Sequence, residues 1–411
     1  MNPSSPAYLS RRQELLLALA VAVVTANAYY IHPIVGDVAK HFGVSEARIG
    51  VVPALNQIAL AVGILLLLPL GDRYSNRNLT IIFSVCQCAG LLAMTFAPDF
   101  LTFTIGSTFL GFFTIAPYLL PAYASKRVAP ERLGYVTATL TAGVIFGILV
   151  ARVGAGVLAD LYDWHAVYWC ASAAMVAVTL AMPRIVPAQD AIVSSKSSSG
   201  GGYLSLVASV FPLLKTHPEI IVSGAIQGIG FGQFIALWLG LALHLTSPAM
   251  GYGTDVVGYL AGFAAFSVLT TPRLGIIADR VGARRARFIY GCVQAAGTAL
   301  FLPFGDNLWL LMIPIMVTST VGPAIDVASR MTFLSAEPEL RTRLTTIYIV
   351  MMFLGGGIGS VAGTWIYDAF GWDGIAIALF ASCFGLTALA GLAWRIWGTH
   401  CAAMNPAHSS P

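Results

Sequence analysis

The sequence predicts an all-α integral membrane protein with twelve transmembrane helices in two pseudo-symmetric six-helix bundles. Three observations support this fold class. Of the 411 residues, 57% are hydrophobic and only 10% are charged, which is too few charged residues for the surface of a soluble globular protein. Long apolar runs recur along the whole chain. A short motif of an aspartate followed by arginines also occurs once in each half, at residues 71–77 and 275–285.

The apolar runs define the expected spans, because a helix needs about 20 apolar residues to cross a bilayer. In the first half they lie at 15–35, 48–70, 78–96, 100–124, 133–158 and 165–183. In the second half they lie at 219–246, 254–277, 286–304, 307–333, 341–366 and 373–397. The first run has no small-residue cleavage pattern, so we expect it to stay in the protein as a spanning helix.

The region between the two sets of spans has the composition of a linker, since it contains a stretch of serine and glycine at 194–202. We therefore expect an N-terminal six-helix bundle at 1–183, a cytoplasmic linker at 184–218, and a C-terminal bundle with a short tail at 219–411. Several residues recur at a shift of 207 or 208 positions, for example Gly147 with Gly355 and Trp164 with Trp372. This recurrence indicates an internal repeat.

The distribution of basic residues predicts the orientation. If the amino terminus is cytoplasmic, all but three of the 22 lysines and arginines fall on or near the cytoplasmic side, the exceptions being Lys40, Arg48 and Arg152. We expect a multi-pass protein of the cell or plasma membrane with both termini in the cytoplasm.

The paired motif carries a resemblance to a known family. The copy in the second half contains Gly275, Asp279, Arg280, Gly282, Arg284 and Arg285. The copy in the first half keeps Asp72, Arg73 and Arg77, but Leu68 replaces the leading glycine and Ser75 and Asn76 replace later motif residues. On these residues the chain resembles the major facilitator superfamily over essentially its whole length. The resemblance implies a secondary transporter that alternates access to the two sides of the membrane, and not an enzyme.

A carboxylate at a helix end can accept charge-assisted hydrogen bonds from a loop arginine and from the amino end of a neighbouring helix. We therefore expect the motif residues to form a conformational latch. The alternative is a charged loop that only fixes the topology.

Within the superfamily, the first, second and fifth helices most resemble the drug and proton antiporter-like branch, which implies proton-coupled export of a small organic solute. Two features depart from that branch: no proline follows Gly143 or Gly147, and Ser107 stands where proton-coupled members carry an arginine. The alternatives are uptake or exchange of an organic anion, and a non-transporting membrane receptor. We expect a monomer in the lipid bilayer whose partners are a small organic solute and protons, with no nucleic acid, no cofactor and no metal.

Ionisable residues inside the spans are candidates for function because they are costly in lipid. Asp326 and Arg330 are four residues apart, so they share one helical face and can form an ion pair or a coupling site. Arg152 is expected either to pair with an acid, with Asp37 as the best candidate, or to bind an anion. His32 can exchange protons or bond to the backbone.

In the superfamily, helices 1, 4, 7 and 10 line a central cavity and helices 2, 5, 8 and 11 flank it. Aromatic, amide and hydroxyl side chains on these helices are the predicted solute contacts: Asn27, Tyr30, Asn56, Gln57, Tyr118, Gln227, Phe231, Phe234, Trp238 and Tyr348. Buried amides need hydrogen-bond partners. As a group these residues predict a pocket for an amphipathic organic solute, although each one alone could serve packing.

Overall fold

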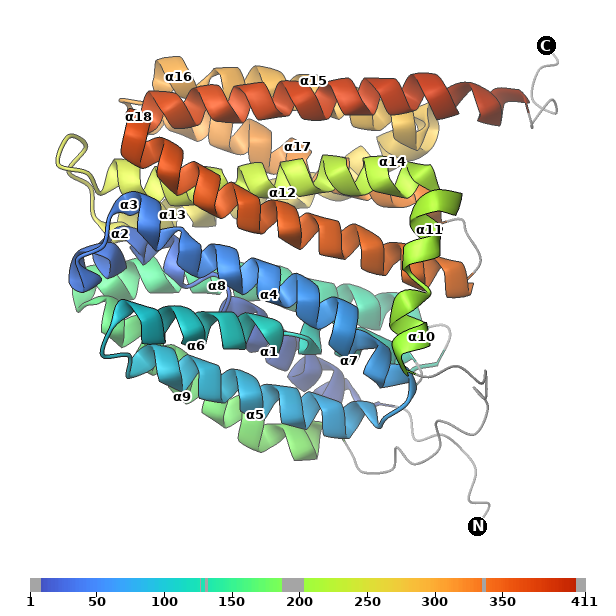
Figure 1. Ribbon diagram of the computed structural model, residues 1–411, viewed down its shortest axis with the longest axis horizontal. Helices are drawn as coiled ribbons and strands as arrows, with labels where there is room; N and C mark the ends of the chain where they lie inside the picture. Colours follow the sequence, from blue (N-terminus) through green and yellow to red (C-terminus); the bar gives the residue numbers. More distant parts are fainter. Residues whose placement is uncertain (1–8, 126, 130–131, 187–202, 335–337, 404–411) are drawn as a thin grey trace. The chain divides into compact units, whose positions relative to one another are not determined.

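The computed structural model describes residues 9–125, 127–129, 132–186, 203–334 and 338–403 (Figure 1). The described residues form helices and the turns that join them, and nine helical stretches among them are long and apolar enough to cross a membrane. By its internal contacts the chain divides into two compact units, one mainly from residues up to Val207 and the other mainly from Ala208 onward. The all-α membrane fold is therefore confirmed.

The N-terminal bundle contains the helices of the first unit. They are α1 (Arg11–Ala26), α2 (Ile31–Phe42), α4 (Val51–Leu67) with the 3-10 helix η1 (Leu68–Asp72), α5 (Asn76–Thr95), α6 (Phe100–Phe112), α7 (Ala116–Ser125), α8 (Leu133–Leu161) and α9 (Trp164–Ile185). A short helix, α3 (Glu46–Ile49), precedes α4. Figure 1 shows α5 beside α6 and α9.

Two predicted spans of this bundle are interrupted. The first span breaks into α1 and α2 at residues 27–30, and the fourth breaks into α6 and α7 at residues 113–115. Pro33 and Pro117 explain the breaks, because proline has no N–H to donate to the carbonyl four residues earlier. The breaks place backbone groups and the predicted site residues Asn27 and Tyr30 at irregular positions inside the bundle.

Three of the longer helices of this bundle begin at side-chain N-caps. Ser10 accepts a hydrogen bond from the backbone N–H of Gln13 at the start of α1, Asp99 accepts one at the start of α6, and Asp163 accepts one at the start of α9. The N–H of Thr102, 2.8 Å from Asp99, lowers the pKa of that exposed carboxyl by stabilising its charged form.

The C-terminal bundle contains the helices from Pro218 onward. They are α12 (Pro218–Leu245), α13 (Thr254–Ala265), the 3-10 helix η3 (Phe266–Thr270), α14 (Thr271–Val281), α15 (Ala283–Ala299), α16 (Phe301–Phe304), α17 (Leu308–Leu334) and α18 (Pro338–Ala403). The last two predicted spans are two helices that share the label α18 (Figure 1) and meet at a kink at Gly371, where φ is 63°. Each predicted span thus corresponds to a helical segment with revised ends.

The predicted linker is more ordered than its composition suggested. Its residues 187–202 lie outside the described part of the chain, but α10 (Tyr203–Ala208) and α11 (Phe211–Thr216) follow them. The serines and glycines at 194–202 predicted a flexible linker, whereas the apolar residues after Gly202 form two short helices.

Small residues hold the first and fifth helices of each bundle together. In the N-terminal bundle a Cβ atom added to Gly147 of α8 would lie 2.2 Å from the carbonyl oxygen of Ala22 in α1. In the C-terminal bundle a Cβ atom added to Gly355 of α18 would lie 2.1 Å from the carbonyl oxygen of Gly228 in α12. The backbones approach this closely only because side chains are absent.

Candidate functional site

A three-residue polar network lies inside the C-terminal bundle. The Nε atom of Arg330 lies 3.0 Å from both carboxylate oxygens of Asp326, one helical turn away on α17. The hydroxyl of Tyr348, on α18, donates to Asp326 Oδ1 at 2.7 Å, and the Arg330 guanidinium lies 4.9 Å from the Tyr348 ring centroid. The predicted ion pair is present, and Tyr348, predicted only as a pocket hydroxyl, joins it.

The N-terminal bundle contains a different buried pair. Arg152 of α8, 4% exposed, has its Nη2 atom 2.9 Å from Nδ1 of His32 in α2. An arginine can only donate, so His32 accepts through Nδ1 and is neutral with its proton on Nε2. The guanidinium also lies 5.6 Å from the ring centroid of Tyr29. The sequence proposed Asp37 as the partner of Arg152, and the structure shows a hydrogen bond of Arg152 with His32.

The two helix breaks of the N-terminal bundle meet at Gln87 of α5. Its fully buried amide donates to the carbonyl of Val24, near the end of α1, at 3.2 Å and to the hydroxyl of Thr114, in the α6–α7 break, at 2.8 Å. Asn27, in the first break, contacts the sulfur of Met175 at 3.4 Å. Gln87 was not among the predicted site residues. Its position, in the middle of the third apolar run, could have identified it, because an amide is unusual there.

The other predicted polar residues of this bundle have separate surroundings. Asn56 of α4 donates to the carbonyl of Ser107 in α6 at 2.8 Å, so it joins two helices. Gln57 is fully buried, and neither of its amide atoms has a hydrogen-bond partner among the described residues. Tyr30 and Tyr118 are half-buried.

The predicted aromatic residues of α12 pack within the C-terminal bundle. The rings of Phe231 and Phe234 stack with their centroids 5.7 Å apart, and Phe231 meets Phe353 of α18 edge-on at 5.5 Å. Gln227 and Trp238 are buried on the same helix. Phe231 thus joins α12 to α18 through an aromatic contact.

The second copy of the motif lies at the turn between α14 and α15. Gly282 has φ of 90°, a conformation that favours glycine, and Arg284 binds both carboxylate oxygens of Glu219 in α12 at 2.6 and 2.7 Å. Arg285 lies 5.9 Å from the ring centroid of Trp394. A Cβ atom on Gly275 would lie 3.8 Å from Val327 of α17, and Asp279 and Arg280 are exposed.

The first copy of the motif has a different geometry. Ser75, which takes the place of Gly282, has an ordinary φ of −59°. Arg77 donates from Nε to the carbonyl of Val186, just after α9, at 2.8 Å. A cation at the carboxyl end of a helix is favourable because of the helix dipole. Arg73 is exposed, and the side chain of Asp72 lies outside the described part of the structure.

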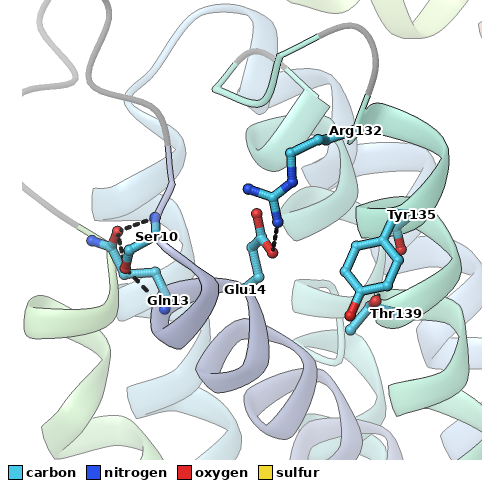
Figure 2. Close-up of polar contacts among 6 residues, drawn as sticks. All are labelled: Ser10, Gln13, Glu14, Arg132, Tyr135 and Thr139. Carbon is cyan, nitrogen blue, oxygen red and sulfur yellow. Dashed lines mark hydrogen bonds and ion pairs between the residues drawn. The ribbon is translucent and has the colours of Figure 1, made fainter.

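An ion pair and a buried arginine were not among the predicted site residues. Arg132, at the start of α8, points toward Glu14 of α1 (Figure 2). Its Nη2 atom lies 2.8 Å from Glu14 Oε2, and Glu14 is 2% exposed whereas Arg132 is 39% exposed. Arg287 of α15 is fully buried and donates from Nη1 to the hydroxyl of Ser223 in α12 at 2.9 Å. Both groups were counted as topology signals near the cytoplasmic side, since sequence alone does not show their burial.

Two bundles of membrane-spanning helices, each with charged groups in its interior, define a multi-pass membrane transporter. The profile of the Major Facilitator Superfamily matches residues 17–247 and 220–406. The chain belongs to that superfamily, whose members are transporters and not enzymes.

Individual relatives agree with this assignment. The chain is 27% identical over 365 residues to the transporter YgaY of Escherichia coli O157:H7, covering 89% of this chain and 91% of that one. It is 28% identical over 394 residues to the probable transporter SCO4007 of Streptomyces coelicolor, covering 95% and 87%. The crystal structure of the nucleoside transporter NupG shares the fold, with a TM-score of 0.73 at 14% identity over 93% of this chain and 99% of that chain.

Proposed function

We propose that this transporter couples the export of a small organic solute to the entry of protons, with Asp326 as the proton-binding group. The observation that carries the proposal is the network of Asp326, Arg330 and Tyr348. A half-buried carboxylate in a membrane protein is a candidate proton carrier by default. Here its charged form is held by one guanidinium and one hydroxyl.

A proton and Arg330 compete for the same carboxylate. When Asp326 binds a proton it loses its charge, so its attraction to Arg330 weakens and the hydrogen bond from Tyr348 rearranges. Because Asp326 lies on α17 and Tyr348 on α18, this change alters a contact between two helices of the bundle. Proton binding can thereby shift the equilibrium between conformations that differ in this contact.

Export is the proposed direction because the first and second helices resemble the drug and proton antiporter-like branch. The glycines of the fifth helix do not add to that argument. Gly143 and Gly147 lie against the backbone of α1, so close packing is sufficient to explain them.

The test is solute flux in sealed proteoliposomes with an imposed pH gradient, using a panel of radiolabelled amphipathic compounds. A proton antiporter accumulates solute when the lumen is acidic, and a symporter does so when the lumen is alkaline. We expect accumulation with an acidic lumen. Flux that does not respond to either gradient would contradict proton coupling.

Asp326→Asn isolates the proposed role of the carboxylate. We expect the substitution to reduce gradient-driven accumulation at least about ten-fold, which corresponds to about 1.4 kcal/mol, while solute exchange without a gradient continues. Asp306→Asn, an exposed aspartate of the same bundle, serves as the matched control and should transport normally. Unchanged coupled accumulation in Asp326→Asn would make the network structural only.

A second candidate, uptake or exchange of an organic anion, is favoured by the guanidinium of Arg152, a cation buried inside the N-terminal bundle. Gradient-independent exchange of labelled anions would support it. Tight solute binding without any flux would instead favour a receptor.

The proposal places the protein as a monomer in the cell membrane with both termini in the cytoplasm. The orientation rests on the positions of the lysines and arginines. Labelling of a single cysteine added at either terminus by a membrane-impermeant reagent in intact cells would contradict it.

A further inference from the structure

Arg287 is a buried cation that the proposed function does not use. Its side chain has no exposed surface, and its one hydrogen bond to a described residue runs from Nη1 to the neutral hydroxyl of Ser223. The Nε and Nη2 atoms have no hydrogen-bond partner among the described residues. The Glu219 carboxylate acts on Arg287 electrostatically but makes no hydrogen bond to it among the described residues. A buried guanidinium with an unbonded edge is unfavourable, which makes such a residue a candidate for binding an anion.

A second arginine on the same helix provides a direct comparison. Arg284, three residues earlier, uses Nε and Nη2 to hold the two oxygens of Glu219 at 2.6 and 2.7 Å. These two nitrogens form one edge of the guanidinium and match the spacing of a carboxylate. The corresponding edge of Arg287 has no such acceptor among the described residues, and Glu219 is already bound by Arg284.

The surroundings of Arg287 are polar on the side of its hydrogen bond. The hydroxyl of Ser223 in α12 lies 3.2 Å from the hydroxyl of Thr332 in α17. Arg287 and these two hydroxyls come from three different helices, α15, α12 and α17. The Thr332 hydroxyl donates to the carbonyl of Ser329 at 2.7 Å, so Ser223 is the donor of this pair and donates to an oxyanion only after its hydroxyl rotates. Because Arg287 is fully buried, a solute reaches it only when these helices separate.

We propose that the Nε and Nη2 edge of Arg287 binds the carboxylate of the transported organic solute. The inference rests on the proposed function and gives its solute a chemical class, an organic acid. The Arg287 guanidinium supplies the two parallel hydrogen bonds, and the hydroxyls of Ser223 and Thr332 line the site.

The first test measures ligand binding to the purified full-length protein. The probes are benzoate, phenylacetate and hexanoate, each compared with its neutral amide. We expect at least one carboxylate, and none of the amides, to raise the unfolding temperature of the wild-type protein. Arg287→Met should abolish the shift, and Arg287→Lys should weaken binding at least ten-fold because it keeps the charge but loses the paired donors. Arg395→Met, which removes an exposed arginine of α18, should bind normally.

Two results would overturn the inference. One is an equal shift with carboxylate and amide, or no shift with any of the probes. The other is unchanged carboxylate binding in Arg287→Met.

A second measurement needs no ligand and compares the two arginines of α15. Arg284→Met removes the partner of Glu219, so we expect a lower unfolding temperature. Arg287→Met removes a buried cation that has no carboxylate partner among the described residues, so its unfolding temperature should equal or exceed that of the wild type. A drop as large as that of Arg284→Met would show that Arg287 has a structural counter-charge within the protein and would overturn the inference.

The outcomes separate this inference from the proposed function. Gradient-driven flux of a solute whose affinity is unchanged in Arg287→Met would leave the proposed function in place and reject the Arg287 site. Carboxylate binding that depends on Arg287, without any flux, would reject the proposed function and keep the site.

Discussion

The two bundles share a packing scheme but differ in where they place charge. In both, the first and fifth helices meet through glycines that contact a backbone carbonyl of the partner helix, as Gly147 does with Ala22 and Gly355 with Gly228. The paired glycines are 208 positions apart in sequence. A helix contact at this distance tolerates no side chain, so the packing is preserved where the sequences have otherwise diverged.

Outside the paired motif, the charged groups in the interior of the bundles do not follow the repeat. The N-terminal bundle has the Glu14–Arg132 pair and the Arg152–His32 contact, whereas the C-terminal bundle has the Asp326–Arg330 pair and the buried Arg287. The helix contacts are therefore shared by the two halves of the repeat, whereas the buried polar groups differ between them.

The shared glycine contacts give the largest expected effect on stability. Gly147→Ala and Gly355→Ala each place a methyl group against backbone, so we expect a loss of about 1–3 kcal/mol of unfolding free energy for either variant. Unfolding in detergent, followed by circular dichroism, would measure it. Gly154→Ala in α8 and Gly385→Ala in α18 are matched controls, because nothing lies within 4 Å of the added Cβ atom. A large loss of stability for the variant of only one bundle would show that the two bundles do not depend equally on this helix contact.

Substitutions at the turn of each motif copy are expected to have the next largest effect on stability. Gly282→Ser should cost about 1–2 kcal/mol of stability because serine is strained at a φ of 90°. The reverse change, Ser75→Gly, meets an ordinary φ and should cost less than about 1 kcal/mol through the entropy of the unfolded chain. The same unfolding measurement distinguishes the two. Equal losses would mean that the two turns have the same backbone requirement.

Removing the ion-pair partner of the buried Glu14 in the N-terminal bundle is expected to have the smallest effect on stability. Arg132→Ala leaves Glu14 without this ion pair, but Arg132 is partly exposed and solvent screens the pair, so we expect a loss of about 1 kcal/mol. The double variant Glu14→Leu with Arg132→Ala should recover most of that loss, because it removes the buried charge as well. A double variant less stable than Arg132→Ala would contradict this account.

The candidate site could be predicted in part. The Asp326–Arg330 pair followed from helical spacing, since residues four apart share a face. The contact of Arg152 with His32, 120 positions away, did not follow, and neither did the addition of Tyr348 to the Asp326 network. Those contacts depend on the rotation of each helix about its axis, and the weakly amphipathic spans of a membrane protein give little information about it.

The membrane class, the approximate positions of the spans and the internal repeat could all be predicted from the amino-acid sequence. Apolar length and repeated motifs are local properties of the chain, so no packing information is needed to recognise them. The folded structure was needed to show that the first and fourth spans break near Pro33 and Pro117, and that Glu14 and Arg287 are buried. Whether a side chain is buried depends on the residues packed around it. For Glu14 and Arg287 these residues come from helices far away in the sequence.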